Sequence, residues 1–120
     1  LKRWFTAGFR AAHPDIVGRI RGVILRTPRE GYAACAAAIQ NACLTSRLSD
    51  IGVSTLIVVG EHDPSTPMSS AELLHRRIRG SELSVIEDAA HMPNIEKAEQ
   101  FSRVVGDFVS RHGAQRRGVQ

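Results

Sequence analysis

The chain has 120 residues with 42% hydrophobic and 23% charged side chains, and its formal net charge is +4; this length and balance are typical of one soluble globular domain. The basic residues are scattered and are not interleaved with aromatic ones, a pattern that argues against a nucleic-acid-binding surface. No apolar run approaches about 18 residues and no secretory leader is visible, so we expect a cytoplasmic protein that does not span a membrane.

The first part of the chain, residues 1–50, is predicted to be helical. Three isoleucines, from Ile16 to Ile24, recur at four-residue spacing, which forms an apolar stripe along one helix face. Residues 27–30 read Thr-Pro-Arg-Glu, the pattern of a capping box with proline at the first helical position. We therefore expect a second helix that continues over residues 31–41, whose many alanines allow another helix or a sheet to approach closely.

The two cysteines, Cys35 and Cys43, lie eight positions apart within this helical region. They form no Cys-x-x-Cys motif and have no further cysteine as a partner, so the sequence predicts neither a disulfide framework nor a zinc site. Buried, reduced thiols are the expected state.

The second part, residues 51–112, alternates strands with helices. Thr55–Val59 is continuously apolar, as is typical of a strand buried on both faces, and Glu82–Ile86 reads as a second short strand. A helical pattern lies between the two strands, and a longer one follows over residues 95–109. Strand, helix, strand and helix at this spacing predict a βαβ unit with a parallel sheet.

One acidic and one basic side chain follow these two strands. Asp63 comes three residues after Gly60, and His91 follows the second strand after a short loop. Functional groups in open parallel sheets collect beyond the carboxyl ends of the strands, so we expect the two side chains to lie close together. A carboxylate followed along the chain by a histidine is the second half of a Ser…Asp…His triad of the α/β-hydrolase type. No Gly-x-Ser-x-Gly motif occurs in the 120 residues.

Other roles for these residues are open. Asp63 precedes Pro64 and is a common residue type in turns, and His91 could be an ordinary loop histidine. A metal site built from His62, Asp63 and His91 is a further alternative, but zinc requires three or four converging ligands with supporting partners. Because His62 and Asp63 are adjacent, their side chains should diverge, and we expect no metal.

Several segments carry a resemblance to a known family. Thr55–Pro67 (TLIVVGEHDPSTP) and Asp88–Glu96 (DAAHMPNIE) resemble the last two strands of α/β-hydrolase proteins and the loops that follow them. Arg3–Thr6 (RWFT), together with Thr27-Pro28 and Glu30–Ile39 (EGYAACAAAI), is similar to the cap of 3-oxoadipate enol-lactone hydrolases. That family opens β-ketoadipate enol-lactone in bacterial aromatic catabolism.

The resemblance implies an α/β fold of which this chain forms the C-terminal part. Residues 1–50 would be a helical cap segment, residues 51–112 the last two parallel strands with their flanking helices, and residues 113–120 a disordered tail. Asp63 and His91 match the triad acid and base of the family, and Trp4 is placed in the cap over the substrate pocket.

The expected activity is that of a serine-type hydrolase acting on a small-molecule lactone, with no cofactor. The nucleophile and the oxyanion-hole loop would come from a missing N-terminal part of the same protein, so we expect the chain alone to be inactive. No nucleic acid or membrane is expected as a partner. Two alternatives stay open, namely another α/β-hydrolase acting on an ester, a C–C bond or a haloalkane, and a non-catalytic fragment.

Overall fold

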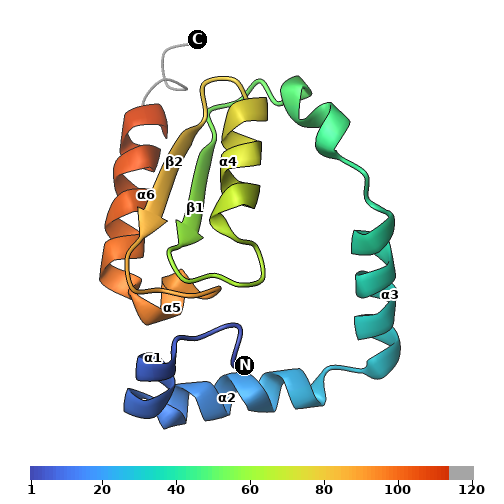
Figure 1. The fold of residues 1–120 in the computed structure, drawn as a ribbon, viewed down its shortest axis with the longest axis vertical. Coiled ribbons are helices and arrows are strands. Elements are labelled where there is room, and N and C mark those ends of the chain that lie inside the picture. The colour runs from blue at the N-terminus through green and yellow to red at the C-terminus, as the bar shows by residue number, and fades with distance from the viewer. Residues whose placement is uncertain (114–120) are drawn as a thin grey trace.

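The computed structural model describes residues 1–113. Its elements in chain order are helices α1 (Ala7–Ala12), α2 (Pro14–Arg26) and α3 (Arg29–Asn41), the 3-10 helix η1 (Thr45–Asp50), strand β1 (Leu56–Gly60), helix α4 (Met68–Arg77), strand β2 (Glu82–Ile86), and helices α5 (Pro93–Glu96) and α6 (Ala98–Gly113) (Figure 1). Of the tail expected over residues 113–120, Gly113 is the last residue of α6, and the rest lies outside the described residues.

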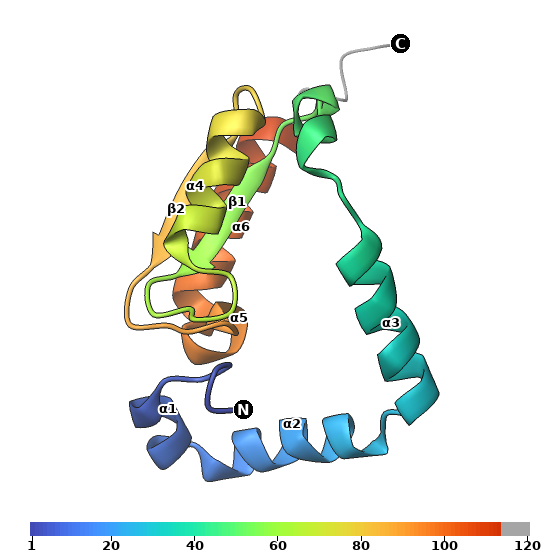
Figure 2. The same cartoon turned by 45° about the vertical axis from the view of Figure 1, so that its right-hand side comes forward.

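The two strands form the expected parallel pair. Leu56 lies opposite Glu82 at the start of the strands, and Gly60 lies opposite Ile86 at their end. Both strands therefore finish at the same edge of the sheet, and α4 provides the crossover between them. Figure 2 shows α4 and α6 on opposite faces of the sheet. The predicted βαβ unit is confirmed, with β1 shifted by one residue from the expected range.

The core lies between β1 and α4. Ile57 and Val59 of β1 are buried together with Ala71 of α4. The half-buried side chains that pack against them are Met68, Leu74 and Leu83. Each large apolar side chain buried in this way contributes about 1.5–3 kcal/mol to stability, so this layer holds the βαβ unit together.

The last helix is attached to the second strand through one carboxylate. Glu82, the first residue of β2, accepts hydrogen bonds from Arg111 Nη2 at 2.5 Å and from His112 Nε2 at 3.1 Å. Both donors lie in the last turn of α6. The C-terminal end of α6 is thereby fixed at the start of β2, and its N-terminal end lies near the loops that carry the candidate site (Figure 1).

Helices α2 and α3 extend away from the sheet before the chain returns through η1 (Figures 1 and 2). Neither helix contains a buried residue. The large apolar side chains that they expose are Val23, Ile24, Leu25, Tyr32 and Ile39. β1 pairs only with β2 among residues 1–113, so its other edge has no strand beside it there. No helix in the described residues is long and apolar enough to cross a membrane.

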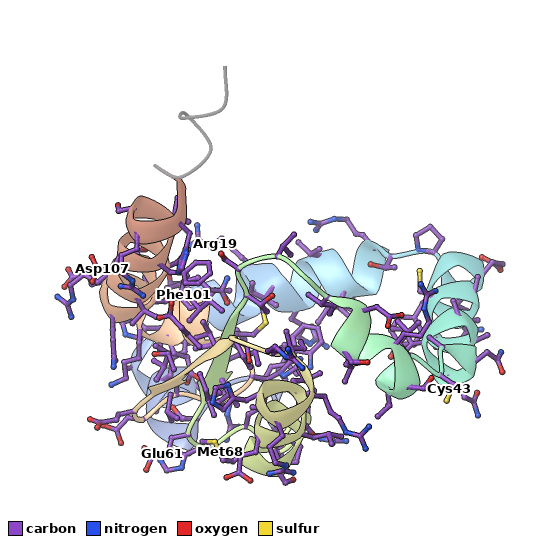
Figure 3. The ribbon with its side chains drawn as sticks, turned by 90° about the horizontal axis from the view of Figure 1, so that it is seen from above. Arg19, Cys43, Glu61, Met68, Phe101 and Asp107 are labelled. Atoms are coloured by element: carbon purple, nitrogen blue, oxygen red, sulfur yellow. The ribbon has the colours of Figure 1, made fainter. Side chains whose placement is uncertain are left out.

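Two local expectations in this region are wrong. The capping box at residues 27–30 does not form, because the Thr27 hydroxyl donates to Val23 O of the preceding helix at 3.2 Å. Pro28 therefore stands before α3 without a side-chain cap, and the helix begins at Arg29. The thiols of Cys35 and Cys43 are exposed rather than buried, since α3 packs against no other layer in residues 1–113. Figure 3 shows Cys43 beyond the end of α3, away from the strands.

A glycine brings the two loops after the strands into contact. A Cβ atom on Gly60 would lie 2.1 Å from Ala90 O and 2.6 Å from Ala89 O, so a side chain here is sterically excluded. The peptides of Ala89 and Ala90 occupy that space, and His62 N–H donates to Ala89 O at 2.8 Å. Asp88 has a φ of 51°, a left-handed conformation that Asp tolerates better than most residues, and it turns the chain back toward β1.

This contact predicts the effect of adding one methyl group. The complete protein here means the whole product of the reading frame that contains this chain. In that protein, Gly60→Ala should lower the free energy of unfolding by about 1–3 kcal/mol or more, because the backbone must move to admit the Cβ atom. The matched control is Gly106→Ala in α6, where a Cβ meets nothing within 4 Å; that change should stabilise by about 0.5–1 kcal/mol.

Chemical denaturation measures both values, and amide exchange at His62 reports on the loop contact itself. Equal stabilities of the two variants, with His62 N–H still protected, would contradict the steric role of Gly60.

Candidate active site

Asp63 organises the turn after β1. Its own N–H donates to Gly60 O at 3.1 Å. Oδ1 accepts the backbone N–H groups of Ser65 at 2.7 Å and Thr66 at 3.1 Å, and Oδ2 accepts the Thr66 hydroxyl at 2.6 Å. Asp63 is therefore a turn residue, as the sequence allowed, and these hydrogen bonds fix the direction of its carboxylate.

His91 faces this carboxylate. Its Nδ1 lies 2.8 Å from Asp63 Oδ2, so the predicted proximity of the two residues is confirmed. The Asp63 side chain is 4% exposed and the His91 side chain 32% exposed. The carboxylate is thus shielded, whereas the imidazole keeps access to the outside. Nε2 of His91 has no hydrogen-bond partner within residues 1–113.

The charge state of Asp63 follows from its partners. Burial alone would raise the pKa of this carboxyl, but hydrogen bonds from the Thr66 hydroxyl, from His91 and from the backbone of Ser65 and Thr66 outweigh it and hold the pKa below its ordinary value. Asp63 is therefore ionised at neutral pH and can only accept hydrogen bonds. The bond from His91 then requires the proton on Nδ1, which leaves Nε2 of the neutral ring as a proton acceptor.

Thr66 is a site residue that the sequence reasoning missed. Its hydroxyl lies 2.6 Å from Asp63 Oδ2 and 3.4 Å from His91 Nδ1, so it stands beside the contact between the two residues. The available signal was the segment Asp-Pro-Ser-Thr, in which a hydroxyl three positions after an aspartate can return to its carboxylate.

The N-terminal segment lies next to the histidine. Trp4 O accepts the N–H of Met92 at 3.1 Å, and the rings of Trp4 and His91 are tilted by 43° with centroids 6.3 Å apart. Arg3 donates to Pro64 O at 3.1 Å, which joins the same segment to the turn that holds Asp63. Trp4 thus lies beside the candidate base, and its place in a cap over the substrate pocket stays a prediction.

The alternative metal site does not assemble as considered. His62 Nε2 lies 3.8 Å from Glu61 Oε2 and 3.9 Å from Asp88 Oδ1, so its ring turns toward these exposed carboxylates. Asp63 and His91 face each other instead. The side chains of the adjacent residues 62 and 63 diverge, as expected for neighbours that leave a strand end in opposite directions.

The contact between Thr66 and Asp63 makes the pKa of Asp63 testable. Thr66→Val removes the hydroxyl donor at nearly constant volume, so the pKa of Asp63 should rise, whereas Thr66→Ser keeps the donor and should preserve it. A group with a lowered folded pKa stabilises the protein above its unfolded pKa, near 3.9, and loses this contribution as the pH falls through the folded pKa. In Thr66→Val the stabilising contribution should therefore be smaller, and its loss should be complete at a higher pH than in the wild type.

Titration of the Asp63 carboxyl carbon by NMR, together with unfolding at several pH values, checks this prediction. An unchanged titration curve in Thr66→Val would show that the Thr66 hydroxyl does not lower the pKa of Asp63.

Comparison with known proteins identifies relatives of this chain. No family model matches the chain. The chain is 33% identical over 109 residues to 3-oxoadipate enol-lactonase 2 of Acinetobacter baylyi, a match that covers 91% of this chain and 40% of the relative. It is 42% identical over 96 residues to a pimeloyl-[acyl-carrier protein] methyl ester esterase of Neisseria meningitidis, covering 78% of this chain and 37% of that protein.

The fold is shared with a solved structure of the same kind. The enol-lactonase from Burkholderia xenovorans LB400 superposes with a TM-score of 0.87 at 35% identity, over 90% of this chain and 41% of that chain. The chain thus spans about two fifths of the length of the relatives that it matches. It is a relative of the 3-oxoadipate enol-lactonases and has the fold of the C-terminal part of an α/β-hydrolase.

Proposed function

We propose that this chain carries the acid and the base of a Ser-His-Asp hydrolase that opens 3-oxoadipate enol-lactone, a step of aromatic catabolism. The observation that supports this proposal is the contact of 2.8 Å between His91 Nδ1 and an ionised, shielded Asp63 carboxylate. A carboxylate in that position fixes the tautomer of the imidazole and stabilises the imidazolium once it forms. The similarity to enol-lactonases supports the choice of substrate.

The proposed mechanism uses Nε2 of His91 twice. In the first half, Nε2 takes the proton of a serine hydroxyl whose oxygen attacks the lactone carbonyl carbon. The bond from that carbon to the ring oxygen then breaks, and the proton on Nε2 passes to the departing enol oxygen. In the second half, Nε2 takes a proton from water, the hydroxide oxygen adds to the acyl carbon, and the serine leaves with the proton returned to it. Asp63 stays ionised throughout.

The nucleophile is proposed to lie outside these 120 residues. In the α/β-hydrolase arrangement the serine precedes the acid and the base along the chain, on a Gly-x-Ser-x-Gly turn, and no such motif occurs here. The relatives are more than twice as long as this chain, and a corresponding remaining part would supply the serine and the oxyanion hole. A cytoplasmic location stays a prediction.

Trp4 is proposed to form part of the substrate pocket. Its ring lies beside the half-exposed ring of His91, at a centroid distance of 6.3 Å, on the segment that leads into the helices assigned to the cap. An aromatic wall next to the base would shield the acyl-enzyme and orient the lactone. The role of a cap for residues 1–50 is likewise a proposal.

Hydrolysis of an acyclic ester is the second candidate. The identity of 42% to a methyl ester esterase favours it, and the acid–base pair serves both substrates by the same steps. Comparing turnover of the enol-lactone with turnover of a small methyl ester separates the two, because the pocket determines which acyl group reaches the serine.

The role of His91 predicts a large effect on turnover. His91→Ala in the complete protein should lower kcat by about 10⁴–10⁶-fold, because triad members act as a unit, while the protein stays folded. His62→Ala removes an imidazole that faces Glu61 and Asp88, and it should keep nearly normal activity. Steady-state hydrolysis of the enol-lactone measures both. Turnover by His91→Ala at the rate of the His62 control would exclude His91 as the base.

The open edge of β1 and the exposed helices predict the behaviour of residues 1–120 alone. This chain should show no Asp63- and His91-dependent hydrolysis and no sharp cooperative unfolding, since an unpaired parallel strand leaves backbone groups and an apolar face uncovered. A thermal melt and an enol-lactone assay on the purified chain test this. A cooperative transition in a monomer, or turnover that Asp63→Asn abolishes, would contradict it.

A further inference from the structure

The carboxylate of Glu96 binds Thr6, which lies 90 positions earlier in the sequence, and also binds the loop that carries His91. Oε1 accepts the backbone N–H of Thr6 at 2.7 Å and the Thr6 hydroxyl at 2.8 Å. Oε2 accepts the backbone N–H of Ala90 at 2.5 Å. One side chain of α5 therefore holds the start of α1 and the residue that precedes His91.

This arrangement uses both oxygens of the Glu96 side chain as acceptors. The Thr6 hydroxyl accepts the N–H of Phe9 at 3.2 Å as the cap of α1, so its own hydrogen is directed to Glu96. Three donors thus converge on one side chain, and only a group with two accepting oxygens serves all of them. With an amide in place of the carboxylate, the NH₂ group would face either Thr6 N–H or Ala90 N–H, and that backbone donor would lose its acceptor.

The contacts of Glu96 hold one side of the candidate base, and Trp4 holds the other. Ala90 N–H, just before His91, donates to Glu96, and Met92 N–H, just after it, donates to Trp4 O at 3.1 Å. Trp4 is two residues from Thr6, which Glu96 also binds. The positions of the imidazole and of the indole beside it therefore depend on the same set of hydrogen bonds.

From these contacts we infer that Glu96 is a positioning residue, which holds the His91 loop and the Trp4 segment in one fixed relation. Its effect on catalysis rests on the proposed function of His91 and Trp4, whereas the coupling between the two segments does not. Glu96 acts through the backbone on both sides of His91. Its loss should release the base and the neighbouring pocket wall together.

The experiment compares Glu96→Gln with Glu99→Gln in the complete protein. Both changes remove one negative charge within neighbouring helices, but Glu99 is exposed at the start of α6. In Glu96→Gln, amide exchange at Ala90 should become at least about tenfold faster, as expected for loss of a hydrogen bond to a charged group. The NMR signals of the His91 ring and the Trp4 indole N–H should shift together. The Glu99→Gln spectrum should match the wild type at these positions.

Kinetics separate positioning from stability. Well below the unfolding temperature, Glu96→Gln should lower kcat/KM for the enol-lactone by about tenfold or more, with kcat lowered and KM raised, because base and pocket wall move together. A wild-type protein without His91-dependent hydrolysis would refute the proposed function, while the exchange and ring signals would still decide the coupling. Wild-type exchange at Ala90 with unshifted His91 and Trp4 signals in Glu96→Gln would overturn the inference.

A second pair of variants decides the matter if Glu96→Gln does not fold. Thr6→Val removes the hydroxyl donor but keeps the carboxylate, and Thr6→Ser retains the hydroxyl. Exchange at Ala90 and the His91 signals should change in Thr6→Val, which loses a bond to Glu96 and the cap of α1, and should stay as in the wild type in Thr6→Ser. Unchanged Ala90 and His91 signals in Thr6→Val would overturn the coupling.

Discussion

The close approach of two backbones at Gly60 is the constraint on which the candidate site depends. Parallel pairing brings β1 and β2 to an end at the same edge, but it does not by itself bring the following loops together. That happens because the peptides of Ala89 and Ala90 occupy the space of the absent side chain, and because His62 N–H continues the pairing by one step to Ala89 O. Asp63 directly follows His62, and His91 directly follows Ala90, so the contact between the loops brings these two side chains together.

The electrostatics of the pair follow from the kind of donor that surrounds Asp63. Its partners other than His91 are neutral, namely the Thr66 hydroxyl and the N–H groups of Ser65 and Thr66. They keep the carboxylate ionised inside the fold without cancelling its charge. Its only ion-pair partner within residues 1–113 is His91, so the negative charge is compensated only when the imidazole takes up a proton.

The sequence predicts the chemistry-bearing part of the fold well, because that part obeys strong local rules. The apolar strands, their parallel pairing and the contact of Asp63 with His91 follow from hydrophobic pattern and strand polarity. The roles of Thr66, Gly60 and Glu96 could not be predicted, since each depends on a contact with backbone or side chains brought near by tertiary structure. The capping box predicted at Thr27 is absent for a related reason. The Thr27 hydroxyl donates to Val23 O of the preceding helix and does not cap α3.

The bond between Thr6 and Glu96 has a consequence for biosynthesis. Its partners are separated by 90 positions, and the same segment carries Phe5, which is 1% exposed in the folded chain. At about 5–20 residues per second, Phe5 and Trp4 wait on the order of 5 to 20 s after their synthesis before Glu96 exists. During that interval two large aromatic side chains have no docking site on this part of the fold. The segment that carries Trp4 and Phe5 can therefore take up its folded position only after α5 has been synthesised.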